Sequence, residues 1–186
     1  ATTTYQMSSG FPLNRDRYMD NIASLRAIQG PIESMQKADA AMGQKKYPEA
    51  ESLLRSALKG APRDYTGLVM MAKCQIAQKR FSEAERYAAD AKRVFPKEAQ
   101  AYHINGFAKL QRKSFDSAHR EFASYDRMLP GNPNITFFKG YCMEGMGNRQ
   151  EAANEYARFL KVVREGDLAQ HAYGRLVAWG YVRTQS

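Results

Sequence analysis

The chain has 186 residues, of which 44% are hydrophobic and 25% charged, a composition that excludes a low-complexity or disordered chain. No apolar run approaches the ~18 residues that span a bilayer, so we expect no transmembrane segment. The formal net charge of +9 makes an anionic partner or surface worth testing.

Residues 1–13 are rich in Thr, Ser, Gly and Pro and show no period, so we expect an irregular segment. Asn14 is a candidate helix N-cap. Beyond it, apolar residues recur at helical spacing and are Tyr18, Ile22, Leu25 and Ile28. The pair Gly30-Pro31 predicts that this helix ends there and that another begins. Two interpretations of residues 1–30 stay open, a cap on the helices after residue 30 or a connection from a preceding domain.

A period of 34 residues organises the chain between Pro31 and Gly166. Segments 47–62, 81–96 and 115–130 each open with an aromatic residue, have Ala three residues later and end on Pro. The repeated residues are Ala50, Ala84, Ala118 and Ala152, and Pro62, Pro96 and Pro130. The repeats are therefore 31–64, 65–98, 99–132 and 133–166.

This period and pattern resemble the tetratricopeptide repeat. The resemblance implies an all-α fold, a superhelix of four helix-turn-helix repeats, each made of two antiparallel helices called A and B. Helix A takes about the first fourteen residues of a repeat, and helix B runs from the aromatic residue to just before the Pro. The eighth position of each repeat is small, so that the two helices can cross closely, and holds Ala38, Ala72, Gly106 and Gly140.

The fourth repeat departs from the pattern. Arg149 stands in the place of the aromatic residue and Arg164 in the place of the Pro. Without that Pro we expect the helix to continue to Gly166, a natural C-cap. Residues 167–186 should form a capping helix and tail, or the first helix of an incomplete fifth repeat. The apolar positions that predict this helix are Leu168, Ala172, Leu176 and Trp179.

Catalytic and metal-binding motifs are absent from the sequence. The three histidines, His103, His119 and His171, lack zinc-ligand spacing, and there is no H-E-x-x-H, Gly-rich phosphate loop or G-x-S-x-G motif. Cys74 and Cys142 occupy the same position two repeats apart, too far for a disulfide, and are expected to be small buried hydrophobes. We therefore expect no catalytic residue, metal or cofactor in this chain, and a binding surface instead.

In tetratricopeptide solenoids the A helices line a concave face, and the resemblance implies that positions 2, 5, 9 and 12 of each repeat point into it. The candidate groove residues are Met35, Asp39, Val69, Lys73, Gln100, His103, Phe107, Asn134, Phe137, Tyr141 and Glu144. Aromatic side chains in a groove are typical anchors for a peptide or a helix. The alternative is that the C-terminal helix covers some of them.

Chaperone-binding members of the family hold a terminal carboxylate with Lys and Asn at positions 5 and 9. Among the residues at those positions here, only Lys73 would suit such a clamp. The sequence therefore favours an apolar or extended client segment over a terminal carboxylate.

A second candidate surface is basic and lies in the turns between helices A and B. Its residues are Lys45, Lys46, Lys79, Arg80, Arg112 and Lys113. Stacked repeats would align them as a stripe that could dock on an anionic surface, and the alternative is that they are ordinary solvated turn residues. No aromatic residues interleave with the stripe, so a nucleic-acid partner is not expected.

The flanking segments 9–30 and 170–183 resemble those around the C-terminal repeats of bacterial exported zinc metallopeptidases. Such proteins have a Ser-Ser/Thr-His-Pro-like segment before an Arg-Tyr or Arg-Ile helix, and here residues 8–12 lack the His. The resemblance implies a periplasmic protein whose upstream part holds zinc through H-E-x-x-H, while this part binds clients, assembly partners or its own peptidase domain. None of those zinc ligands lies in this chain. The alternatives are a stand-alone adaptor, cytoplasmic in that case, and a homo-oligomer formed through an uncapped solenoid end.

Overall fold

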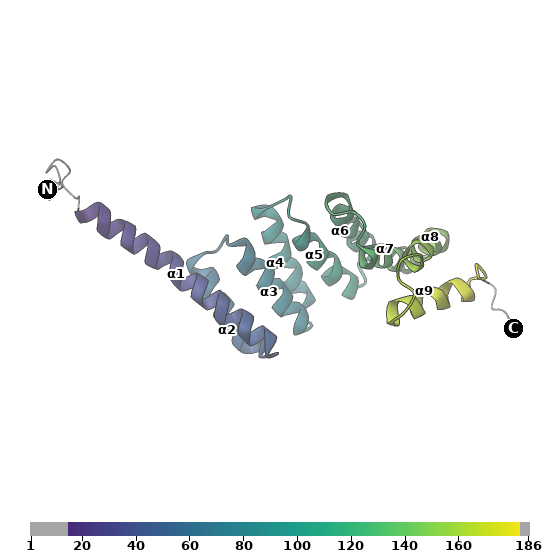
Figure 1. Cartoon of the computed structure of the whole chain (residues 1–186), viewed down its shortest axis with the longest axis horizontal. Coiled ribbons are helices and arrows are strands. Elements are labelled where there is room, and N and C mark those ends of the chain that lie inside the picture. The colour runs from purple at the N-terminus through teal and green to yellow at the C-terminus, as the bar shows by residue number, and fades with distance from the viewer. Residues whose placement is uncertain (1–14, 183–186) are drawn as a thin grey trace, which may run out of the picture.

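A computed structural model describes residues 15–182, with side chains from Ala23 onward, and this part of the chain is an elongated row of helices (Figure 1). The expectations for residues 1–13 and for a cap at Asn14 lie outside the described residues. The helices are α1 (Arg15–Gly43), α2 (Tyr47–Gly60), α3 (Tyr65–Ala77), α4 (Phe81–Val94), α5 (Ala99–Gln111), α6 (Phe115–Met128), α7 (Pro133–Gly145), α8 (Arg149–Leu160) and α9 (Asp167–Ala178). None of these helices is both long enough and apolar enough to cross a membrane.

Consecutive helices pack as pairs, α1 with α2, α3 with α4, α5 with α6 and α7 with α8, and each pair also contacts the next. The predicted all-α superhelix is thereby confirmed. Small residues allow the close crossing of A and B. A Cβ atom on Gly106 would lie 2.8 Å from the ring of Phe122, and one on Gly140 would lie 3.0 Å from the ring of Tyr156. Glycine is therefore what lets each ring rest on the backbone of the neighbouring helix.

The predicted helix break at Gly30-Pro31 is wrong, because α1 continues through Pro31. Proline removes one backbone hydrogen bond, to the carbonyl four residues earlier, and Ala27 is exposed, so water can take that place. The ring of Pro31 also packs at the end of α2, where a Cβ on Gly60 would lie 3.0 Å from Pro31 Cγ. As a result, residues 15–30 extend the first A helix beyond its own repeat (Figure 1).

The predicted extension of the last B helix to Gly166 is also wrong, because α8 ends at Leu160. The amides of Val162 and Val163 both donate to the carbonyl of Phe159, which closes the chain into a turn. Two consecutive β-branched residues are weaker helix formers, and the turn lets the next helix fold back. Gly166 has a φ of +94° and precedes α9.

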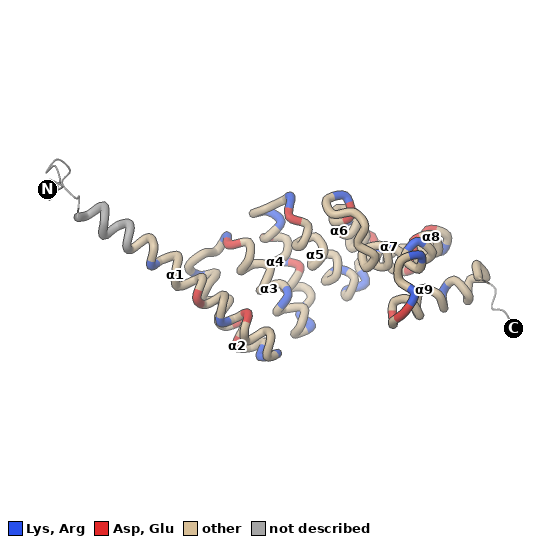
Figure 2. Tube along the Cα trace, in the orientation of Figure 1, with Lys and Arg blue, Asp and Glu red and all other residues tan. Residues whose placement is uncertain are grey.

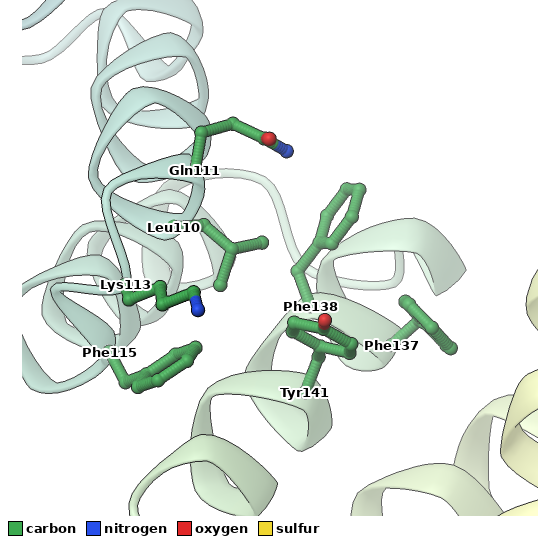
Figure 3. A pocket seen from close by; sticks show the side chains of 7 residues that line it. All are labelled: Leu110, Gln111, Lys113, Phe115, Phe137, Phe138 and Tyr141. Carbon is green, nitrogen blue, oxygen red and sulfur yellow. The ribbon is translucent and has the colours of Figure 1, made fainter. Parts of the chain in front are cut away.

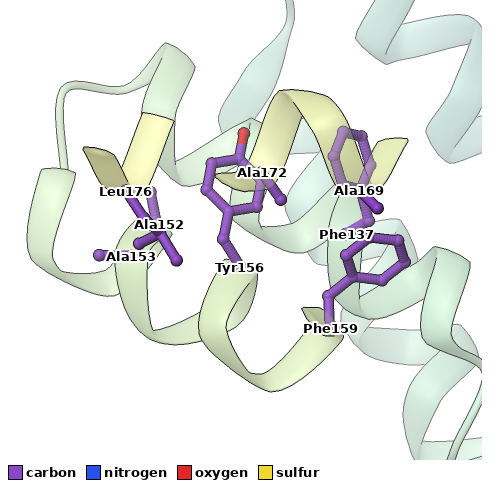
Figure 4. Packing of buried hydrophobic residues seen from close by; sticks show 8 residues of the cluster. All are labelled: Phe137, Ala152, Ala153, Tyr156, Phe159, Ala169, Ala172 and Leu176. Carbon is purple, nitrogen blue, oxygen red and sulfur yellow. The ribbon is translucent and has the colours of Figure 1, made fainter. Parts of the chain in front are cut away.

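The core runs along the row of helices, and its last part joins α7, α8 and α9 (Figure 4). It consists of Phe137, Ala152, Ala153, Tyr156, Phe159, Ala169, Ala172 and Leu176. Both cysteines, Cys74 and Cys142, are free and buried as expected. Burial raises the pKa of the Cys142 thiol from 9.0 to about 12, so this thiol stays protonated.

A buried carboxylate ties α2 to the second repeat. Glu51 accepts hydrogen bonds from Arg55 at 2.6 Å, from Gln78 at 2.9 Å and from Arg80 at 2.9 Å. Burial alone would raise the pKa of Glu51. Hydrogen bonds from Gln78, Arg55 and Gln75, together with the charge of Arg80, outweigh burial and lower the pKa from 4.5 to about 2.

Glu51→Gln should remove a pH-dependent contribution to stability, on the order of 2 kcal/mol at neutral pH. The folded protein holds this proton more weakly than the unfolded chain does. The contribution is therefore complete above pH 4.5 and disappears as the pH falls towards 2. Urea unfolding followed by circular dichroism should show wild-type stability falling more steeply than that of the variant in this window. Glu49→Gln, an exposed position of the same helix, is the control, and equal slopes for wild type and Glu51→Gln would contradict the prediction.

Candidate functional site

The structure places the predicted groove residues on the A helices α1, α3, α5 and α7, but not all of them offer a surface. The exposed ones are Asp39, Lys73, Gln100, Asn134 and Tyr141, and the half-buried ones are Met35, His103, Phe107 and Glu144. Val69 is buried, so its assignment as a ligand contact is corrected, whereas Phe137 is buried but still lines the cavity described below. Val69 packs in the core between the second and third repeats.

Phe137 is covered by the C-terminal helix. Its ring lies 5.6 Å from that of His171 on α9 and 5.3 Å from that of Phe159 on α8. Tyr141, one helical turn further along α7, keeps 37% of its surface exposed. The ring of His171 also lies 5.5 Å from that of Tyr141. The C-terminal helix therefore covers Phe137 and contacts Tyr141, but it leaves part of Tyr141 exposed.

An aromatic cluster joins α5 to α7, and its central residue is one that the sequence positions missed. Phe138 stacks on Phe122 with 5.3 Å between ring centroids, meets Phe107 edge-on at 6.1 Å and lies 6.3 Å from the ring of His103. It occupies position 6 of its repeat, beside the buried Phe137. The sequence signal for Phe138 was its place in the consecutive pair Phe137-Phe138. It was missed because only Phe137 falls on a position assigned to the groove.

A cavity of about 260 Å³ lies beside this cluster (Figure 3). It is lined by Leu110, Gln111, Lys113, Phe115, Phe137, Phe138 and Tyr141. Residues from the end of α5 and the start of α6 face Phe138 and Tyr141 of α7 across it (Figure 3). The volume is below the range of about 300–1,000 Å³ usual for small-molecule sites, so the cavity suits one apolar side chain of a larger ligand.

Polar groups stand near the cluster. Lys73 is exposed and makes no ion pair with any described residue. Burial, and then the charge of Lys73, lower the pKa of His103 below its ordinary value of 6.5. At neutral pH His103 is therefore an uncharged imidazole that can both donate and accept a hydrogen bond.

Glu144 is not available to a ligand, because other side chains use its carboxylate. Tyr156 donates a hydrogen bond of 2.6 Å to Glu144 Oε2, and Arg175 Nε lies 2.6 Å from Oε1. His171 Nε2 lies 3.3 Å from Oε2. Burial, and then the hydrogen bond to Glu144, raise the pKa of Tyr156, which keeps its hydroxyl a donor. His171 and Arg175 fall on positions 5 and 9 of a fifth repeat, so continuing the repeat numbering past residue 166 would have found them.

The basic turns lie along one edge of the molecule (Figure 2). Two of the six residues are engaged within the fold, since Arg80 pairs with Glu51 at 2.9 Å and Arg112 with Glu85 at 2.8 Å. The four lysines of the stripe are exposed. Three of them, Lys45, Lys79 and Lys113, have left-handed backbone with φ of 59°, 59° and 58°. Gly147 holds the same place in the fourth repeat, so this turn geometry repeats every 34 residues.

No metal-binding group of three or more His, Cys, Asp or Glu side chains occurs within the described part of the chain.

The stacked helix pairs and the groove on their A helices define a tetratricopeptide-repeat solenoid. Consistently, residues 41–104 match the tetratricopeptide repeat family.

Solved structures with this fold resemble the chain along most of its length. MamA from Desulfovibrio magneticus RS-1, residues 41 to the end, has a TM-score of 0.75 at 13% identity over 81% of this chain and 85% of that one. YrrB, described as a repeat protein with an unusual peptide-binding site, has a TM-score of 0.68 at 18% identity, covering 74% and 71%. The first repeat domain of Spaghetti (RPAP3), solved with an HSP90 peptide, has a TM-score of 0.63 at 18% identity, covering 64% and 95%. At these identities the likeness shows the fold alone. None of the curated proteins matches the chain.

Proposed function

We propose that this chain is a protein-interaction module that holds a client segment on its A helices, with one apolar client side chain in the cavity beside Phe138 and Tyr141. The observation that carries the proposal is the cavity itself, which has mostly apolar walls, with Gln111 and Lys113 among them, and is built from two neighbouring repeats. Tyr141 would contact this client side chain, and Phe107, which packs edge-on against Phe138, would contact the client beside the cavity. His103, Gln100 and Asn134 would supply hydrogen bonds to the client backbone or side chains.

The similar folds support a peptide as the client. The RPAP3 domain was solved with an HSP90 peptide, and YrrB is described by its peptide-binding site. The assigned groove residues differ from a carboxylate clamp, because Lys73 is the one lysine or arginine among them and the centre of the groove is aromatic. An internal apolar residue of the client, rather than its terminal carboxylate, should therefore dominate recognition.

The test begins with a library of random linear peptides displayed on phage and selected against the whole 186-residue chain. The affinity of the enriched peptides should fall about 10- to 100-fold when Phe107→Ala and Tyr141→Ala are combined, a loss of about 1.4–2.7 kcal/mol for the two aromatic contacts together. Fluorescence anisotropy of labelled peptides measures the change, and circular dichroism checks that the helical content is kept.

Leu129→Ala is the matched control, because Leu129 is exposed and apolar but is not among the residues that line the cavity. It should leave peptide affinity unchanged. Enriched peptides that bind the double variant as tightly as the wild type, or a selection that enriches none, would refute the groove assignment.

The segments on either side of the repeats point to the kind of protein that contains this module. The flanks 9–30 and 170–183 resemble those of exported zinc metallopeptidases, and on this support we propose that the chain is the client-holding part of such a periplasmic enzyme. The encoded sequence immediately before Ala1 decides the matter, since it must then contain H-E-x-x-H and a further zinc ligand. Another sequence there would leave an adaptor that works without an attached enzyme.

A further inference from the structure

The last helix, α9, is an A-type helix that has no B helix against it within the described residues. The eighth repeat position is buried in all four preceding repeats, at Ala38, Ala72, Gly106 and Gly140. The equivalent residue of α9 is Gly174, which is exposed, and a Cβ built on it would meet nothing within 4 Å. The surface that a B helix covers in every other repeat is therefore open here.

The open surface is apolar and concave. A cavity of about 580 Å³ lies between α8 and α9, and its apolar walls come from Leu160, Tyr173, Leu176 and Val182. Tyr173 precedes Gly174 and is 47% exposed. The corresponding seventh position is buried in the second and third repeats, at Met71 and Asn105. A helix laid beside α8 would cover this surface as the earlier B helices cover theirs.

The opposite end of the molecule carries an apolar helical stripe that no other part of the described chain covers. Leu25 and Ile28 in the projecting part of α1 are 66% and 59% exposed, and Ile32, just inside the first repeat, is 45% exposed. These residues are spaced by three and then four positions. Each B helix has an apolar pair at the first of these spacings, in Leu54 and Ala57, in Ala88 and Ala91, in Phe122 and Tyr125, and in Tyr156 and Phe159. Leu25 and Ile28 of α1 thus have the spacing of the apolar pair that each B helix packs against its neighbours.

We propose that the projecting half of α1 from a second copy of this chain docks on α9, in the place of the missing B helix. Leu25 would then rest on Gly174, as Phe122 rests on Gly106 and Tyr156 on Gly140. The α1 stripe of one copy cannot reach the α9 surface of the same copy, because the two helices lie at opposite ends of the elongated molecule (Figure 1). The contact joins two different surfaces, so it is head-to-tail and continues the solenoid from one copy into the next.

Two variants, each altered at one end, test this contact. Leu25→Glu with Ile28→Glu places charges on the exposed stripe of α1 and leaves the repeats intact. Gly174→Gln fills the docking position, and it has room in the single chain because nothing lies within 4 Å. The control is Ala77→Gln, which adds the same side chain at an exposed position of α3, away from both proposed contact surfaces.

Light scattering coupled to size exclusion should show that the average mass of the wild type and of the control rises with concentration, up to about 0.5 mM, a range that captures weak contacts. Each end variant alone should stay monomeric. Their equimolar mixture should form a complex of two chains and no larger one, because only one compatible pair of ends remains.

The results that overturn the proposal are distinct. A wild type that stays monomeric over this range excludes the contact, whatever else binds α9. Continued self-association of the Gly174→Gln variant removes α9 as the acceptor. A wild type that associates, with a mixture that stays monomeric, means that the contact is not head-to-tail.

Discussion

Phe122→Ala should lower the free energy of unfolding by about 3–5 kcal/mol, the usual cost of removing a fully buried aromatic side chain. Phe122 is completely buried on α6. Its ring rests on the backbone at Gly106 and stacks on Phe138 with a centroid distance of 5.3 Å. Because the facing residue is glycine, no side chain is present to expand into the space that the ring leaves. The cavity should therefore remain largely unfilled.

Urea unfolding followed by circular dichroism measures this loss. Leu129→Ala is the control, since it removes an exposed apolar side chain just beyond the same helix and should change stability by less than about 0.5 kcal/mol. A Phe122→Ala variant that loses less than about 1 kcal/mol would mean that α5 and α6 close the gap by moving together. Phe122 also supports Phe138 and His103 from behind, so peptide binding should weaken with it.

Tyr156→Ala should release α9 from the end of the solenoid, at a local cost of about 3–5 kcal/mol. The ring of Tyr156 is buried and contacts those of Phe137, His171 and Trp179. Its hydroxyl donates to Glu144, which in turn holds Arg175. In a solenoid each repeat contacts only its neighbours, so the loss should stay at this end.

Hydrogen exchange measured by mass spectrometry can locate the effect. Amides of α8 and α9 should exchange much faster in Tyr156→Ala, whereas those of α3 and α4 should keep wild-type protection. Tyr156→Phe, which keeps the ring and removes the hydroxyl, should cost about 1 kcal/mol because only one hydrogen bond is lost. Equal acceleration along the whole chain would show that the solenoid unfolds as one unit.

The burial of Phe137 shows where the sequence positions were insufficient. Position 5 of a repeat faces the concave side, but its exposure depends on the next repeat. Here His171 of α9 lies against both the Phe137 and the Tyr141 rings, but only Tyr141 keeps an exposed part, 37% of its surface. Phe138 was missed for the converse reason, since aromatic packing between α5 and α7 brings a position outside the assigned set to the edge of the cavity.

The sequence by itself determined the number, pairing and spacing of the helices from α2 to α7. The 34-residue period, the small eighth positions and the terminal prolines are local constraints, and each of them acts within one repeat or between neighbours. The tertiary structure decided the two ends. Helix α1 continues through Pro31, and α8 ends at Leu160 before it reaches Gly166. Both results depend on which residues pack against these two helix segments. It also decided which groove residues remain accessible, since burial is a property of the neighbours of a residue and not of its position in a repeat.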